Sequence, residues 1–600
     1  MDVSLDNDMI VEATETQAEA APNAAPGAPS QVFNNMELSS LIMQSLKGIT
    51  LQESGVAPVV PPGGLKTCRP APWRQYFARL TTVNRTVFHA SIEVLWEHMS
   101  SLEPFFSTLL PADRKQNDMF SILLSYYRGV RSVQWHRFTL YSSRTKSLAL
   151  NRFTSPQIDE SSWVMFLATD KTKPDLLFPA LKAVYLCSNS NLSLLVAFSF
   201  APYITSITVD LDAGSNEPVE ESGIALTTLL QERARNLTHA ALLSPFNSDT
   251  ASRIFEITSL SSLSLHANGE TSAVDFTRVK NLPLLEKLQF TQTLDASRPS
   301  PLPPLLDFPR VISAPLDGSP RLQELSVRAN PATHYQLAAS ISSPSLESIN
   351  LVFLSDHPEE HAMIIPHILT IHAKRNLNLK SLVAEYWTRG IHWDQDTINP
   401  MRGDPLYDKA LSFTQALSAL RNLTTLKILS VPFLTVDILA LMLDAVHSLP
   451  MLELLWLDVT NMTELEEDEV VIPFLHSLDN ISRTNQRLNH CVLPIDLAEV
   501  PPIPNDYIST NRLKKLDLCT MTVEDLEERS TEYRLRIAQY LDRLFPHLET
   551  LTDTLPITDA WGRKAWGEIF AMVSTFQALR AQAARDIART AGTGMLVEGD

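Results

Sequence analysis

The hydrophobic residues of this chain recur in one short pattern, with apolar side chains at positions i, i+3 and i+5. Side chains alternate between the two faces of a strand, so residues i+3 and i+5 share one face, and residue i packs at the bend before it. Twelve such phrases are too many to arise by chance inside buried helices. They begin at Val130, Leu181, Ile204, Leu260, Leu285, Leu322, Leu346, Leu379, Leu423, Leu452, Leu513 and Leu548.

Amphipathic helical stretches lie between the phrases. Residues 434–449 and 531–545 both carry apolar side chains at a spacing of three to four ahead of the next strand. Alternating helices and short parallel strands predict an α/β leucine-rich-repeat solenoid, a horseshoe in which no single repeat buries its own apolar edge. The spacing between phrases is uneven, so we expect missed repeats or insertions such as the charged segment 463–469.

Composition divides the chain into four parts. Residues 1–31 are rich in small, acidic and proline residues and predict a disordered leader. Residues 32–111 form a helical module interrupted by a proline- and glycine-rich loop at 52–72. Residues 112–575 form the irregular repeat array, and residues 576–600 form a helix end and tail.

Three short helices are predicted in the module, over residues 36–46, 76–88 and 91–102, each with one apolar face. Three such helices make a unit too small for a large core, so it needs a partner or a neighbouring domain. An alternative interpretation is that these helices only cap the first repeat.

The module resembles the F-box of fungal F-box proteins, in which a Glu-Leu pair opens a helix and an Ala-Leu-x-x-Leu-Trp helix closes the unit. In this sequence Met36 and the preceding pair Val32-Phe33 replace the usual Leu-Pro, Met43 replaces a common aromatic, and Asn84 replaces a cysteine. The residues that match the family pattern are Glu37, Leu38, Ile42, Leu46, Val83, Arg85, Phe88, Ala90, Leu95 and Trp96.

The resemblance implies a substrate-recognition subunit of an SCF-type cullin ubiquitin ligase. The F-box would bind the small Skp-type adaptor, and the repeats would bind an unidentified protein substrate. The alternative is a leucine-rich-repeat scaffold whose degenerate F-box takes no part in ubiquitination. The residues that the resemblance assigns to adaptor binding are Val32, Phe33, Met36, Leu38, Leu41, Ile42, Leu46, Val83, Phe88, Leu95 and Trp96.

Charge and cysteine content limit the partners and the compartment. A formal net charge of −19 argues against nucleic acid and anionic membrane surfaces as partners. No apolar run is long enough for a membrane span, and the N-terminus has no secretory signal. The 4 cysteines form no CxxC pair, which suits a reducing compartment, so we expect the cytoplasm or the nucleus.

Signatures of enzymes are scarce. With only 17 glycines the chain has no GxGxxG, Walker or GxSxG motif. His357, Glu360 and His361 fit an HxxEH zinc pattern, but Pro358 and the acidic residues suit a helix start better. We therefore expect no catalytic residue, no metal and no cofactor; the competing interpretation is a hydrolase or metalloenzyme hidden in the array.

The substrate is expected on the concave face of the repeats between residues 420 and 520, where alternate strand residues point outward. Trp456 is a large aromatic at such a position, with Lys515 and Asp517 on a later strand. The alternative for Trp456 is packing under the charged segment 463–469.

Overall fold

A computed structural model describes the chain as two compact units, Met1–His266 and Ala267–Asp600. No non-proline or proline peptide bond in the described residues is cis. The described residues are 36–53, 79–81, 84–100, 102, 104–105, 132–151, 174–187, 203–210, 220–267, 274–293, 319–354, 364–387, 405–430, 436–458, 475–495, 497, 499–502, 509–519, 529–552 and 560–594.

The first unit begins with helices and continues into parallel strands that follow chain order. Its described helices are α2 (Met36–Glu53), α4 (Arg85–Glu97), α7 (Ser132–Ser142), α10 (Glu220–Arg233) and α11 (Ser248–Ile254). Its strands are β1 (His98–Met99), β2 (Ser147–Asn151), β3 (Ala183–Cys187), β4 (Ser206–Val209), β5 (His239–Phe246) and β6 (Ser262–Ala267).

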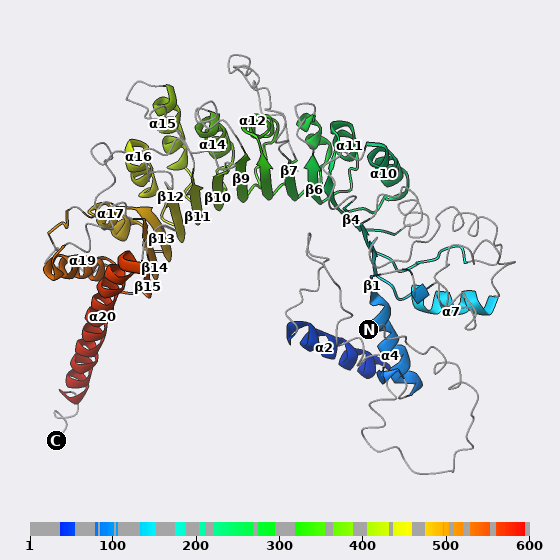
Figure 1. The fold of residues 1–600 in the computed structure, drawn as a ribbon, viewed down its shortest axis with the longest axis horizontal. Helices are drawn as coiled ribbons and strands as arrows, with labels where there is room; N and C mark the ends of the chain where they lie inside the picture. Colours follow the sequence, from blue (N-terminus) through cyan, green and yellow to red (C-terminus); the bar gives the residue numbers. More distant parts are fainter. Residues whose placement is uncertain are drawn as a thin grey trace, which may run out of the picture. The chain divides into compact units, whose positions relative to one another are not determined.

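In the second unit most described strands are followed by a helix, and helices α12–α17 lie on one side of the parallel strands (Figure 1). Its strands are β7 (Lys287–Gln292), β8 (Glu324–Ala329), β9 (Ser348–Leu354), β10 (Ser381–Trp387), β11 (Thr425–Leu429), β12 (Leu454–Asp458), β13 (His490–Pro494), β14 (Lys515–Cys519) and β15 (Thr550–Thr552). Its helices are η5 (Phe276–Asn281), α12 (Pro331–Ser340), α14 (Ile364–Arg375), α15 (Pro405–Leu417), α16 (Val436–Val446), α17 (Ser477–Thr484), α19 (Thr531–Leu544) and α20 (Ala560–Gly594).

The apolar phrases produce the strands and their register. Eleven of the twelve phrases coincide with strands. Their i+3 residues are buried, and so are the i+5 residues of all of them except the phrase at Leu548. Equivalent positions pair with each other, as Leu382 pairs with Leu426 and Leu426 with Leu455. One column of buried side chains therefore runs across each unit, with helices packed on its far side. These features are consistent with a leucine-rich-repeat solenoid, so the predicted α/β class is confirmed at that level.

Two kinds of difference separate the prediction from the structure. The strand predicted from the phrase at Val130 is wrong, because Ser132–Ser142 is helix α7 and Trp135 is buried in this helix. Strands β1, β2, β5 and β13 carry no phrase that the pattern recognised. In β5 and β13 a small side chain, Ala240 or Cys491, stands at the buried i+3 position.

The helical segment before the array also differs from the prediction. Asn84 caps α4, since its side chain accepts a hydrogen bond from the Val87 amide at 2.8 Å. No glycine or proline follows until the helix ends, so α4 crosses the break expected between residues 88 and 91. His98 and Met99 then extend as β1 and pair with β2, so this segment continues directly into the strands.

Helix α20 closes the C-terminal end of the array. Trp566, Ile569 and Val573 are buried where α20 packs against α19 and β15. An ion pair between Arg534 Nη1 and Glu568 Oε2, 2.6 Å long, joins α19 to α20. The described residues 581–589 of the same helix are all exposed.

Two helical glycines should respond in opposite ways to alanine. A Cβ on Gly223 of α10 would lie 2.6 Å from the Thr250 hydroxyl oxygen and 3.1 Å from the Phe246 ring, both of them buried side chains. We expect Gly223→Ala to lower the free energy of unfolding by about 1–3 kcal/mol through overpacking. A Cβ on Gly567 of α20 meets nothing within 4 Å, so Gly567→Ala should raise stability by about 0.5–1 kcal/mol.

Urea unfolding of the full chain, with hydrogen exchange to localise the change, tests this pair. Gly567→Ala serves as the control, because it makes the same chemical change where space is free. A stabilising Gly223→Ala would show that α10 and α11 separate easily and are not held in close contact.

Candidate functional site

Helices α2 and α4 form a small packed pair in the first unit. Met43 of α2 packs with Val87, Ala90 and Val94 of α4. A hydrogen bond of 3.0 Å from the Ser40 hydroxyl to the Glu93 carboxylate joins the same two helices. This packing determines which side of α2 faces solvent.

The other side of α2 exposes large apolar side chains. Leu38 and Leu41 are 43% and 64% exposed, whereas Met43 is 2% exposed. Met36 is also exposed and Ile42 is half-buried. Leucines of this exposure on one helix face are typical of a surface that another protein covers.

The remaining residues assigned to adaptor binding divide into two groups. Val32, Phe33 and Val83 lie outside the described residues, and so does the side chain of Leu46. The other three are half-buried. Phe88 lies 5.4 Å from the His89 ring, centroid to centroid, Leu95 packs against the α2–α4 core, and Trp96 has ring contacts of its own.

Trp96 joins the helix pair to helix α7. Its ring stacks on Tyr141 of α7 with centroids 4.3 Å apart, and it meets Phe105 edge-on at 4.9 Å. Phe105 in turn contacts Phe138 and Phe178, and all three phenylalanines are buried. These contacts use Trp96 for packing within the chain, so Trp96 does not belong to the exposed face of α2.

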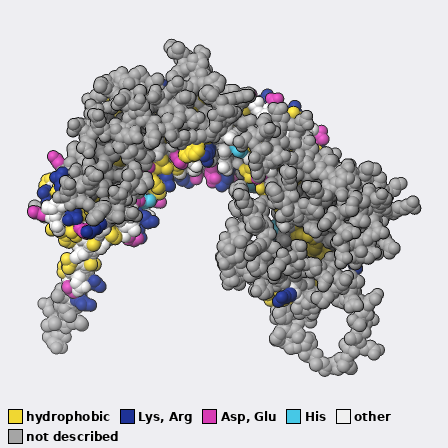
Figure 2. Space-filling model, in the orientation of Figure 1, with side chains coloured by type: hydrophobic (Ala, Val, Ile, Leu, Met, Phe, Trp, Pro, Cys, Tyr) yellow, Lys and Arg dark blue, Asp and Glu magenta, His cyan; other side chains and the backbone are white. Residues whose placement is uncertain are grey.

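A second group of side chains lies on the strand side of the second unit, where hydrophobic and charged groups alternate (Figure 2). The strand residues that point away from the helices are equivalent from one strand to the next. Lys427 pairs in register with Trp456 of the next strand. The outward side chains that contact one another across β11–β15 are Lys427, Trp456, His490, Asp517 and Thr552.

Trp456 lies on this face, as the sequence predicted, and is half-buried. The Lys427 ammonium lies 5.2 Å above its ring, and the His490 ring is 6.1 Å away. The indole N–H is buried and donates to no acceptor among the described residues. The alternative for Trp456 was packing under the charged segment 463–469, and this segment lies outside the described residues.

Lys515 and Asp517 lie on the same face of β14 but differ in their surroundings. Lys515 is exposed. Asp517 is half-buried and lies 2.8 Å from His490 Nε2, and the Thr552 hydroxyl donates to its other oxygen. Asp517 is therefore engaged by its neighbours, while Lys515 is available to a partner.

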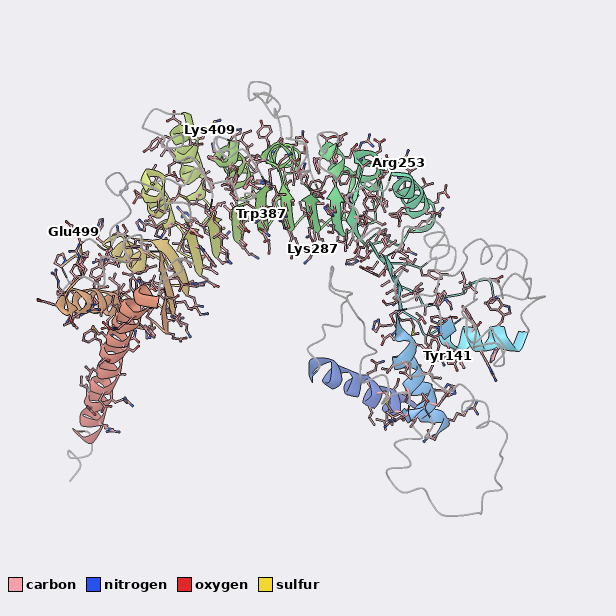
Figure 3. The ribbon with its side chains drawn as sticks, in the orientation of Figure 1. Tyr141, Arg253, Lys287, Trp387, Lys409 and Glu499 are labelled. Carbon is pink, nitrogen blue, oxygen red and sulfur yellow. The ribbon has the colours of Figure 1, made fainter. Side chains whose placement is uncertain are left out.

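Sequence reasoning missed a second tryptophan on this face. Trp387 ends β10 and is 43% exposed, with the Arg328 guanidinium 5.2 Å above its ring (Figure 3). Alternation along β10 was the available signal, because Ser381, Val383 and Glu385 share its face. The apolar phrase ends at i+5, three residues before Trp387, so the pattern did not reach it.

The described residues include no cluster of three His, Cys, Asp or Glu side chains that could hold a metal ion. The HxxEH pattern at His357, Glu360 and His361 lies outside the part of the chain that is described. None of the described helices is both long and apolar enough to cross a membrane.

No protein-family model matches the chain, and no curated protein matches it. Solved structures that align with it include a protein from Bacteroides fragilis, at 11% identity over 60% of this chain and 67% of that one, with a TM-score of 0.24. TLR13 in complex with ssRNA13 aligns at 13% identity over 71% and 48%, with a TM-score of 0.29. The yeast Rad7–Elc1 complex aligns at 13% identity over 72% and 97%, with a TM-score of 0.24. Because these TM-scores are low, the fold assignment rests on the chain's own strands and register.

Proposed function

We propose that this chain is the substrate-recognition subunit of an SCF-type cullin ubiquitin ligase. In this proposal α2 and α4 bind a Skp-type adaptor, and the repeat array binds a protein substrate. The chain itself carries out no chemistry; it raises the concentration of substrate lysines near the ubiquitin thioester.

The exposed apolar face of α2 is the observation that carries the proposal. Leu38 belongs to the part of the sequence that resembles an F-box, and Leu41 lies beside it on the side of α2 opposite Met43. Covering the exposed part of each leucine, 43% and 64% of its surface, would contribute roughly 0.6–2 kcal/mol. A helix pair that exposes large apolar side chains in this way is suited to binding another protein.

Replacing Leu38 and Leu41 together by Asp should remove adaptor binding. The exposed parts of the two leucines account together for about 1.6–3 kcal/mol, so affinity should fall by at least about tenfold. Both side chains are exposed, so the fold should tolerate the change. The measurement is co-purification of the full chain with a co-expressed Skp-type adaptor, together with circular dichroism of each variant.

Leu579→Asp with Ile587→Asp provides the matched control. These two residues of α20 are 62% and 68% exposed, so the control introduces the same charges at apolar sites that are at least as exposed on average. Undiminished adaptor capture by the α2 variant would contradict the docking face. A wild-type chain that captures no adaptor would favour the leucine-rich scaffold that takes no part in ubiquitination.

A further inference from the structure

The outward residues on the strand side of the second unit change character along the array. The outward side chains of β7, β8 and β15 are polar, whereas on β9–β13 large apolar side chains stand among the polar ones. An apolar surface with a polar rim is the usual anatomy of a protein-binding site. The polar flanks comprise Lys287, Gln289, Thr291, Glu324, Ser326 and Arg328 on one side and Lys515, Asp517, Thr550 and Thr552 on the other.

We define the apolar band as the apolar outward side chains of β9–β12 that are not fully buried. Two of these are the tryptophans Trp387 and Trp456, which offer large contact areas at low entropic cost. None of these side chains is fully buried, although each faces away from the helices. The members of the band are Val352, Val383, Trp387, Leu429, Leu454 and Trp456.

Two carboxylates interrupt this band at one level of the strands. Val352 pairs with Glu385, Glu385 with Leu429, and Leu429 with Asp458, so the two acids stand on either side of Leu429. With strands about 4.8 Å apart, their backbones are about 10 Å apart. Neither carboxylate has a hydrogen bond or an ion pair anywhere in the described part of the chain.

The cation within the band does not neutralise these acids. The Lys427 ammonium lies 5.2 Å from the Trp456 ring centre and forms no ion pair with a described carboxylate. Burial raises the pKa of the Asp458 carboxyl to about 6, which reflects the free-energy cost of a charge with no partner. A cation brought by a partner would offset that cost.

We propose that the apolar band binds an extended protein segment in which a lysine or arginine is flanked by apolar residues. The cation lies above Leu429, between Glu385 and Asp458, and the flanking apolar side chains lie on Trp387 and Trp456. This names the substrate class for the function proposed above and rests on that function only for its biological purpose.

The charges of the band distinguish between classes of partner. An acidic or phosphorylated segment would bring further negative charge to two unpaired carboxylates, which is unfavourable in a partly apolar setting. A purely apolar segment would bury both carboxylates without a partner. A segment with one cation and apolar neighbours satisfies both parts of the band at once.

Labelled peptide pools of about nine residues test the proposal, since an extended peptide of that length crosses five strands. One pool has a central arginine flanked by leucine and phenylalanine positions, and the matched pool has citrulline, which keeps the shape but removes the charge. Fluorescence anisotropy with the full chain at about 0.15 M salt measures both affinities. The arginine pool should bind at least about tenfold more tightly than the citrulline pool.

Variants of the chain locate the effect. Glu385→Gln with Asp458→Asn should make the two pools bind equally, whereas Glu324→Gln on the polar flank should leave the preference unchanged. Trp456→Ala should weaken both pools and lower the melting temperature by no more than a few degrees. The preference for arginine should also decrease as the pH falls through about 6, because Asp458 then takes up a proton.

Equal binding of the two pools by the wild-type chain, or no measurable binding of either, would overturn the proposal. Loss of the preference for arginine in Glu324→Gln would also overturn the proposal, since the preference would then reflect the overall charge of the strand face. The adaptor is absent from this assay, so failure of adaptor capture and failure of peptide binding are separate results.

Discussion

Leu455→Ala is expected to lower the free energy of unfolding of the second unit by about 2–5 kcal/mol. Leu455 is fully buried and stands in register between Leu426 of β11 and Cys491 of β13. Truncating Leu455 leaves a cavity in the buried column. The neighbouring side chains on β11 and β13 cannot fill this cavity. Cys491 is already a small side chain, so little volume is available on that side to fill the gap.

The adjacent Leu454→Ala provides the control, because Leu454 points outward from the same strand and is half-buried. Leu454→Ala should lower the free energy of unfolding much less than Leu455→Ala does. Urea unfolding combined with hydrogen exchange of the β11–β13 peptides measures both variants. Equal losses for the two leucines would mean that β12 does not present alternate faces to the core and to solvent.

Acid should unfold the second unit at a mild pH, because two histidines are buried between its helices and strands. His334 of α12 has a pKa lowered to about 4 and His372 of α14 a pKa lowered to about 3, in both cases mainly by desolvation. His334 Nε2 lies 3.1 Å from the Val352 carbonyl oxygen, and its ring lies 4.3 Å from Phe353. Both rings are therefore uncharged in the folded chain at neutral pH.

The direction of the effect follows from proton uptake. In the unfolded chain each histidine titrates near 6.5, so below that pH the unfolded state binds more protons than the folded state. The stability is fully present above pH 6.5 and is lost as the pH falls toward 4 and 3. Proton uptake by each histidine should lower the free energy of unfolding by roughly 2–3 kcal/mol between pH 6.5 and pH 4, because each pH unit contributes about 1.4 kcal/mol.

Urea unfolding at a series of pH values between 7 and 4 measures this loss. His372→Leu should reduce the slope of stability against pH, because one of the two proton-binding sites of the unfolded state is gone. His547→Leu removes an exposed histidine of the same unit and serves as the control. An unchanged slope in His372→Leu would show that His372 is accessible to protons in the folded chain.

The parallel strands were predictable because the apolar phrase indicates directly which positions of each strand are buried. Where i+3 and i+5 are leucine, isoleucine or valine, the strand forms as expected, as at Leu263 and Leu265 of β6. The pattern fails where the packing admits a small residue, since Ala240 and Cys491 stand at buried i+3 positions of their strands but are only weakly hydrophobic. It also fails at Trp135, because a short apolar run fits a buried helix equally well.

The candidate sites were predictable in position but not in their contacts. Alternation along β12 placed Trp456 on the outward face, yet the unpaired state of Asp458 depends on which side chains of neighbouring strands reach it. Similarly, helical periodicity placed Leu38 and Leu41 on α2, but the direction of that face depends on how Met43 packs against α4. The stacking of Trp96 on Tyr141 could not be predicted from the sequence, because the two residues are far apart along the chain.

Helix α20 has a consequence for how the array ends. A final strand presents unpaired backbone groups that can recruit a strand from another molecule, and β15 is only 3 residues long. By burying Trp566 and Ile569 beside β15 and α19, α20 covers the apolar end of the stack and protects it from self-association. Removing α20 would therefore favour oligomers and fibres before it abolished the fold, and unfolding of the second unit would begin at that end.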